Sequence, residues 1–93
     1  MNMMKFNPGI TIRQVADENI VMRMGGAAAD LTTVMALNET SMLIYNHFKG
    51  KTFTADEVVA LLCDEFEVDE ATARNDVAAW ERDMRKEGLI IDA

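Results

Sequence analysis

The sequence is poor in the side chains on which most catalytic and metal sites depend. Its 93 residues include one Cys, one His, one Tyr and one Trp, and Ser41 is the single serine. Because Cys63 has no second cysteine, an internal disulfide is impossible, and Cys63 and His47 alone cannot supply a Cys/His zinc site. We therefore expect no metal, no cofactor and no catalytic residue.

A serine–histidine pair within one helix is also excluded. Ser41 and His47 lie six residues apart, which turns them about 240° from each other on a helix. The chain has no G-x-S-x-G motif to present a nucleophile. We interpret His47 as a surface or core-edge residue.

No signal for secretion or membrane insertion is present. No apolar run approaches the roughly 18 residues that cross a bilayer, and the start MNMMKFNPG lacks the apolar core of a signal peptide. A lone cysteine suits a reducing compartment. These features predict a cytoplasmic location and no membrane partner.

Negative charge is unevenly distributed along the chain. The net charge is −7, yet residues 1–36 carry three basic and three acidic groups, whereas residues 37–93 carry six basic and thirteen acidic groups. An acidic field repels a phosphate backbone. We expect no nucleic-acid partner.

Two short motifs fail on closer inspection. Gly50-Lys51-Thr52 resembles the end of a phosphate-binding loop, but Tyr45 stands where that loop needs its first glycine. The acidic run 64–70 lacks the glycine of a calcium loop and places Phe66 and Val68 at alternate positions. Neither motif predicts a site.

The first part of the chain is typical of a small antiparallel sheet. Strands are predicted at 10–15, 20–24 and 31–37, with a turn at 16–19 and Gly25-Gly26 ending the second strand. In the third strand, alternation predicts one common face for Leu31, Thr33, Met35 and Leu37. The first residues, with Met1, Met3 and Met4, are expected to be frayed.

The second part predicts three helices at 39–49, 55–67 and 70–87. Their starts are Asn38, the capping box Thr54 to Glu57, and Asp69. Gly50 and Gly88 can take left-handed positions after helices, and 89–91 is expected to be extended. The apolar positions at helical spacing are Val59, Leu62, Cys63, Phe66, Ala73, Val77, Trp80 and Met84.

Together these elements predict a single α+β domain over 1–93. Its architecture is winged helix-turn-helix-like, with an N-terminal three-stranded antiparallel sheet followed by a three-helix bundle. Domains of this type often read DNA with basic residues on a helix. Here the last helix carries four basic and five acidic residues, so its electrostatics oppose that use.

Several segments resemble the PqqD family, the pyrroloquinoline quinone biosynthesis protein D group. They are Leu37-Asn38-Glu39-Thr40-Ser41, Leu43-Ile44-Tyr45 closing at Gly50, Val68-Asp69-Glu70 with Ala73 and Asp76-Val77, and Glu87-Gly88-Leu89-Ile90. The resemblance runs from about Phe6 to Ile91. Ser41 stands where the family usually has Gly, and Tyr45 where Trp is common.

The resemblance implies a non-catalytic adaptor that binds the leader segment of a ribosomally made precursor peptide. It would present that peptide to a radical SAM protein or another modifying enzyme. The family binds peptide along its third strand and last helix. On this chain the implied strand residues are Leu31, Thr32, Thr33, Val34 and Met35, and the helix stripe beside the core positions is Arg74, Ala78, Glu81 and Arg85.

Two other functions stay open at this point: a winged-helix DNA-binding regulator and a general protein–protein interaction module. The same strand edge could also pair with a second copy of the chain. The sequence does not name the precursor peptide, its product or the enzyme partner.

Overall fold

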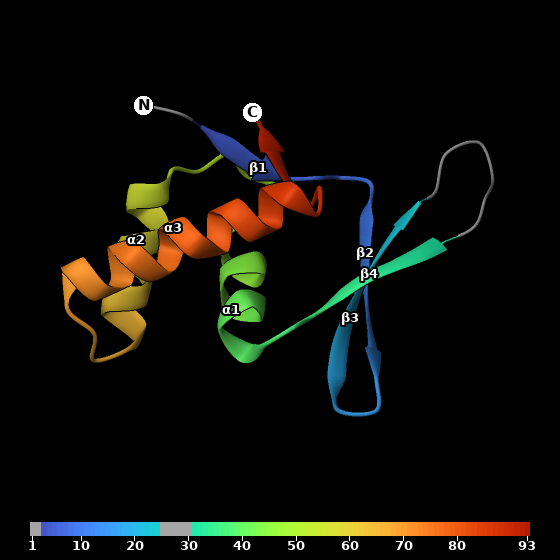
Figure 1. The fold of residues 1–93 in the computed structure, drawn as a ribbon, viewed down its shortest axis with the longest axis horizontal. Helices are drawn as coiled ribbons and strands as arrows, with labels where there is room; N and C mark the ends of the chain where they lie inside the picture. Colours follow the sequence, from blue (N-terminus) through green and yellow to red (C-terminus); the bar gives the residue numbers. More distant parts are fainter. Residues whose placement is uncertain (1–2, 25–30) are drawn as a thin grey trace.

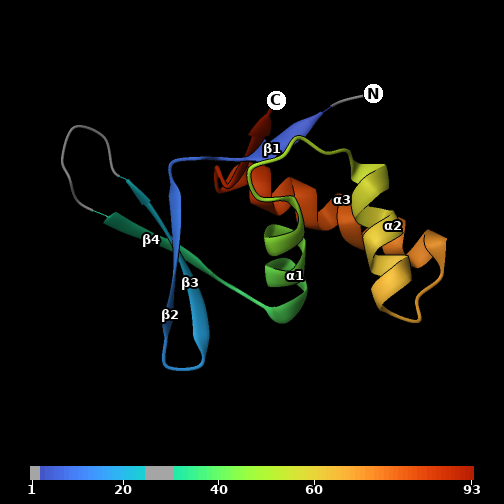
Figure 2. The same ribbon diagram turned by 180° about the vertical axis from the view of Figure 1, so that it is seen from behind.

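In a computed structural model the described residues are 3–24 and 31–93, and they form an α+β fold with a small sheet to one side of a helical part (Figures 1 and 2). Strands precede three helices, and a short strand ends the chain, which confirms the predicted fold class. In chain order the elements are β1 Met4–Phe6, β2 Ile10–Val15, β3 Glu18–Met24, β4 Leu31–Leu37, α1 Glu39–Phe48, α2 Ala55–Glu65, α3 Glu70–Lys86 and β5 Ile90–Asp92.

Strands β2, β3 and β4 form an antiparallel sheet in that order. The turn is shorter than the sequence suggested: Val15 pairs with Glu18, so Glu18 and Asn19 belong to β3 and the predicted turn over 16–19 is wrong at those two residues. Ala16 has a φ of 56°, in the left-handed region that favours glycine. The predicted break at Gly25-Gly26 lies outside the described residues.

The register between β3 and β4 shifts in the middle of the sheet. Val21 pairs with Met35 and the next residue, Met22, pairs with Thr33, so Val34 lies between two paired positions. Such an irregularity bends a strand and increases its twist. Toward the helices Leu37 is buried and Met35 packs against the core, whereas the side chains of Leu31 and Thr33 lie outside the described residues.

Each helix begins at the residue that local chemistry predicts. The Asn38 side chain accepts a hydrogen bond from the Ser41 amide (2.8 Å), and the Asp69 side chain accepts one from the Thr72 amide (2.7 Å). Thr54 and Glu57 form the capping box in both directions. The helices end slightly earlier than predicted, at Phe48, Glu65 and Lys86.

The hydrogen bond that caps α3 at Asp69 also makes the stability of the fold depend on pH. The Thr72 amide hydrogen bond lowers the pKa of Asp69 below its usual value, because it stabilises the carboxylate. A carboxyl group with a lowered pKa stabilises the fold at neutral pH and loses that effect as the pH falls through the lowered value. The start of α3 therefore weakens in acid.

The sequence did not predict strand β1, which joins the start of the described chain to its end. Lys5 pairs with Ile91 of β5, and Met4 forms a bridge with Phe53 through hydrogen bonds in both directions (2.8 and 2.9 Å). The expectation that Met4 is frayed is wrong: its side chain is only 1% exposed and lies in the core. The two ends of the described chain thus lie side by side (Figure 1).

The main core lies between the helices and the β1–β5 pair. Its largest fully buried side chains are Phe53, Met4, Ile44, Met84, Leu89 and Ile90. Phe66 was expected on the apolar face of α2, but α2 ends before it and its side chain is 45% exposed. Among the described helices, none is both long and apolar enough to span a membrane.

Truncating Met4 should destabilise the fold strongly. Met4→Ala leaves a cavity beneath β1, and we expect a loss of about 2–5 kcal/mol in the free energy of unfolding by urea denaturation. Met3→Ala is the matched control, because Met3 is 40% exposed and should change stability by no more than about 0.5 kcal/mol. Equal stability of the two variants would show that β1 is not part of the cooperative fold.

Candidate peptide-binding site

The outer edge of β4 is open. β4 pairs with β3 on one side only, and no other described strand covers its second side. An antiparallel edge of seven residues presents a row of unpaired amides and carbonyls over roughly 23 Å. Leu31, Thr32, Thr33, Val34 and Met35, the predicted peptide-contacting residues of the strand, all lie on β4, and the side chains of the first four lie outside the described residues.

On α3, the structure places the predicted stripe in two separate groups. Arg74 is near the start of the helix, where it binds Asp56 of α2 (2.7 Å) and Glu70 (2.9 Å). Arg85 is eleven residues further on, about 16 Å along the helix axis, and binds Glu81 (3.0 Å) and Asp92 of β5 (2.8 Å). Ala78 is exposed between them.

Both arginines are therefore already paired within the chain. The hydrogen bonds that Arg74 donates to Asp56 and Glu70 raise the pKa of Arg74, and those that Arg85 donates to Glu81 and Asp92 raise the pKa of Arg85. An acidic group on a peptide would have to share these guanidinium ions with the existing carboxylates. That Arg74 and Arg85 pair with a leader stays a prediction. The acidic groups of the leader would compete with the carboxylates that already bind these two side chains.

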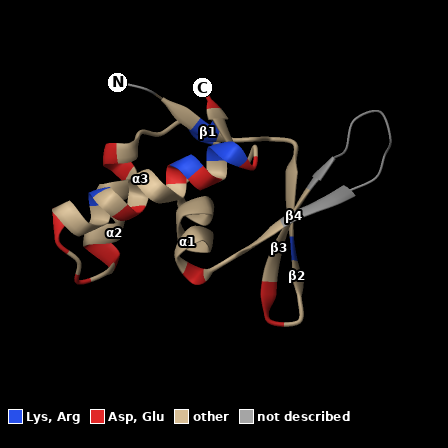
Figure 3. Cartoon of the chain, viewed as in Figure 1, with Lys and Arg blue, Asp and Glu red and all other residues tan. Residues whose placement is uncertain are grey.

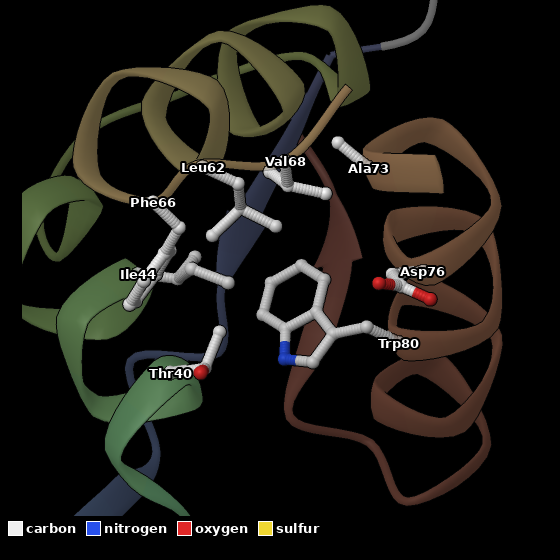
Figure 4. Close-up of a pocket in the computed structure, with 8 residues that line it drawn as sticks. All are labelled: Thr40, Ile44, Leu62, Phe66, Val68, Ala73, Asp76 and Trp80. Carbon is white, nitrogen blue, oxygen red and sulfur yellow. The ribbon is translucent and has the colours of Figure 1, made fainter. Parts of the chain in front are cut away.

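A pocket that the sequence did not predict lies between the three helices. It has a volume of about 260 Å³ (Figure 4). Its lining residues come from all three helices and the α2–α3 loop: Thr40, Ile44, Leu62, Phe66, Val68, Ala73, Asp76 and Trp80. We call it the apolar pocket, because six of these eight side chains are hydrocarbon or aromatic.

Trp80 forms one wall of the apolar pocket and is fixed there by a hydrogen bond. Its indole Nε1 donates to the Ser41 hydroxyl of α1 at 3.1 Å, and the ring points into the pocket (Figure 4). Helical spacing predicts that Trp80 belongs to the core stripe of α3, and Ala73, Val77 and Met84 of that stripe are buried. What spacing cannot show is that Trp80 is only half-buried.

The charges of the described surface fall mainly on the helices. Acidic residues gather over α2 and along α3, whereas the described parts of β2 and β3 carry few charges (Figure 3). His47 is exposed, with its ring against Phe48. Among the described residues, no three His, Cys, Asp or Glu side chains come together as a metal site would require.

The fold and the open edge define a class, namely winged-helix-like α+β domains with an unpaired edge strand. The chain belongs to the PqqD family, described as coenzyme PQQ synthesis protein D, whose sequence profile matches residues 18–90. No curated protein matches the chain by sequence.

Two solved structures share the fold. One is described as lasso peptide synthetase B1 complexed with the leader peptide; it has a TM-score of 0.67 and 22% identity, and the match covers 95% of this chain and 96% of that one. The other is TbiB1 in complex with the TbiA(beta) leader peptide, with a TM-score of 0.64, 18% identity and coverage of 92% and 93%.

Removing the Ser41 hydroxyl should loosen the Trp80 wall. Ser41→Ala leaves the indole N–H without its partner, and we expect a loss of about 1 kcal/mol in the free energy of unfolding together with a shift in tryptophan emission. Asn46→Ala, an exposed change on the same helix, is the control. An unchanged emission spectrum and unchanged stability would show that this hydrogen bond does not fix the ring.

Proposed function

We propose that this protein is a non-catalytic adaptor that binds the leader segment of a ribosomally made precursor peptide and presents it to a modifying enzyme. The observation that carries the proposal is the open edge of β4 in a chain of the PqqD family. An extended peptide can add to such an edge as a further strand, with affinity from backbone hydrogen bonds and selectivity from alternate side chains. In both structural relatives, the bound molecule is a leader peptide.

The neighbouring surfaces give such a peptide two further contacts. Thr40, three residues after the end of β4, lines the apolar pocket, and we place in this pocket a part of the peptide that extends past Leu37. On α3, the small exposed side chain of Ala78 leaves room for a peptide side chain beside Glu81 and Arg85. The leader would therefore combine strand pairing with one apolar anchor.

A partner enzyme is part of the proposal, because an adaptor without chemistry of its own needs one. A radical SAM protein is our first candidate, in keeping with the quinone pathway after which the family is described. Binding to DNA is the rival function. The net charge of −7 disfavours it, because α3 has no excess of basic residues to offset that charge. Retardation of duplex DNA at about 50 mM salt would support that rival instead.

The direct test is titration of the labelled protein with the leader of the precursor peptide encoded beside it. We expect amide shifts in 31–37 and 74–85, and Ala78→Trp should weaken leader binding by about tenfold or more, because a bulky ring fills the space on α3. Ala79→Trp, one residue away on another face, should bind as the wild type does. Shifts confined to other residues, or none at high micromolar peptide, would refute this placement.

The apolar anchor has its own test. Phe66→Ala removes an exposed ring of the apolar pocket, and we expect about three- to tenfold weaker leader binding with little loss of stability, since the ring is only half-buried. Val15→Ala is the control, because Val15 is also exposed but lies at the β2–β3 turn. Identical affinities of these two variants would mean that the leader does not enter the pocket.

A further inference from the structure

A second groove lies away from the β4 edge and has the opposite character from the rest of the surface. It has a volume of about 480 Å³ and runs between the β1–β2 connection and the end of α1. Its lining residues are Lys5, Phe6, Asn7, Pro8, Ile10, Tyr45, Lys49, Gly50, Lys51 and Thr52. We call it the lysine groove, because three lysines and no carboxylate line it.

These lysines are unusual in a chain with a net charge of −7. Within the described part of the chain, Arg74, Arg82 and Arg85 each pair with a carboxylate, whereas the groove residues Lys5, Lys49 and Lys51 have no ion pair, as is also true of Arg13 and Lys86 outside the groove. The Lys49 ammonium lies over the Tyr45 ring, 5.9 Å from its centroid. The groove therefore concentrates uncompensated positive charge in a protein that is otherwise acidic.

Both walls of the groove are fixed by the fold. On one side, the Asn7 amide donates to the Leu89 carbonyl (2.8 Å) and the Asn7 side chain donates to the Gly88 carbonyl (3.0 Å). On the other side, the Lys49 amide donates to the Tyr45 carbonyl (2.8 Å) and the Lys51 amide to the Phe48 carbonyl (2.9 Å). The groove is thus formed before anything binds in it.

We propose that the lysine groove is a second interaction surface, which binds an acidic segment of a partner protein that also carries an apolar side chain. The three lysines match the acidic groups, and Phe6, Pro8, Ile10 and Tyr45 provide the apolar part of the lining. Electrostatic complementarity of this kind steers a partner and fixes its orientation.

A protein segment fits this groove better than a phosphate or a nucleic acid. The Gly9, Lys49 and Lys51 amides already donate to oxygen atoms of the chain, so they are not available to hold a phosphate. The sixteen acidic residues of the chain repel a polyanion that extends beyond the groove. The apolar lining has no use in phosphate binding.

The groove is separate from the proposed leader site. Ile10 is the first residue of β2, and β2 and β4 are the two opposite edges of the sheet. A partner in the lysine groove and a strand on β4 can therefore be bound at the same time, as an adaptor between two molecules requires. The proposal itself does not rest on leader binding.

The test uses the whole protein without leader and a fluorescein-labelled synthetic peptide of about eight residues, alternating Glu or Asp with Phe or Leu, which is long enough to span the groove. We expect saturable binding by fluorescence anisotropy, and no binding of the same peptide with Gln and Asn in place of its acidic residues. The double variant Lys49→Glu, Lys51→Glu should weaken binding by about tenfold or more.

The control is the double variant Arg13→Glu, Lys86→Glu, which changes the net charge by the same amount at exposed residues outside the groove. It should bind the acidic peptide within about twofold of the wild type, since the three lysines that line the groove are kept. Circular dichroism of each variant reports that the fold is intact.

Three results would overturn the proposal: no saturable binding of the acidic peptide, equal weakening in both double variants, or displacement of the peptide by inorganic phosphate or duplex DNA. A leader titration of the Lys49→Glu, Lys51→Glu variant separates the two sites. Leader binding should be unchanged there, and a failure of all variants to bind leader would count against the proposed function and not against the lysine groove.

Discussion

The structure depends most on the pairing of β1 with two partners that are far away in sequence. Met4 bridges to Phe53 in the α1–α2 connection, and the same strand pairs with β5 at the end of the chain. This contact buries Met4 and Phe6, holds the end of α3 through Leu89 and Ile90, and leads into Asn7, whose hydrogen bonds fix one wall of the lysine groove.

The sequence predicts best those elements whose signals lie within a few residues of one another. Asn38, Thr54 and Asp69 each accept a hydrogen bond from the amide three residues ahead, so a few neighbouring residues are enough to predict where each helix begins. Strand β1 has only three residues, and its partners lie more than 45 positions away in the sequence, so no local sequence pattern predicts it. The predicted hairpin turn is two residues too long. Glu18 and Asn19 are residue types common in turns, yet both pair with β2 as part of β3.

For the candidate site too, some parts could be predicted from the sequence and others could not. The sequence pointed to β4 and α3 through a family resemblance, and the open edge of β4 agrees with that choice. It did not reveal the ion pairs of Arg74 with Asp56 and of Arg85 with Asp92, because these two carboxylates come from other elements. The apolar pocket and the lysine groove were hidden for the same reason, since each is assembled from segments that only the fold brings together.

The central claim is that a leader peptide adds to β4 as a strand, and backbone hydrogen exchange tests it most directly. In the free protein no described strand pairs with the outward amides of β4, so they should exchange quickly. Saturating leader should slow exchange at alternate amides within 31–37, because only every second amide faces the new strand. If leader binds while exchange along β4 stays unchanged, strand addition is contradicted and the peptide binds elsewhere.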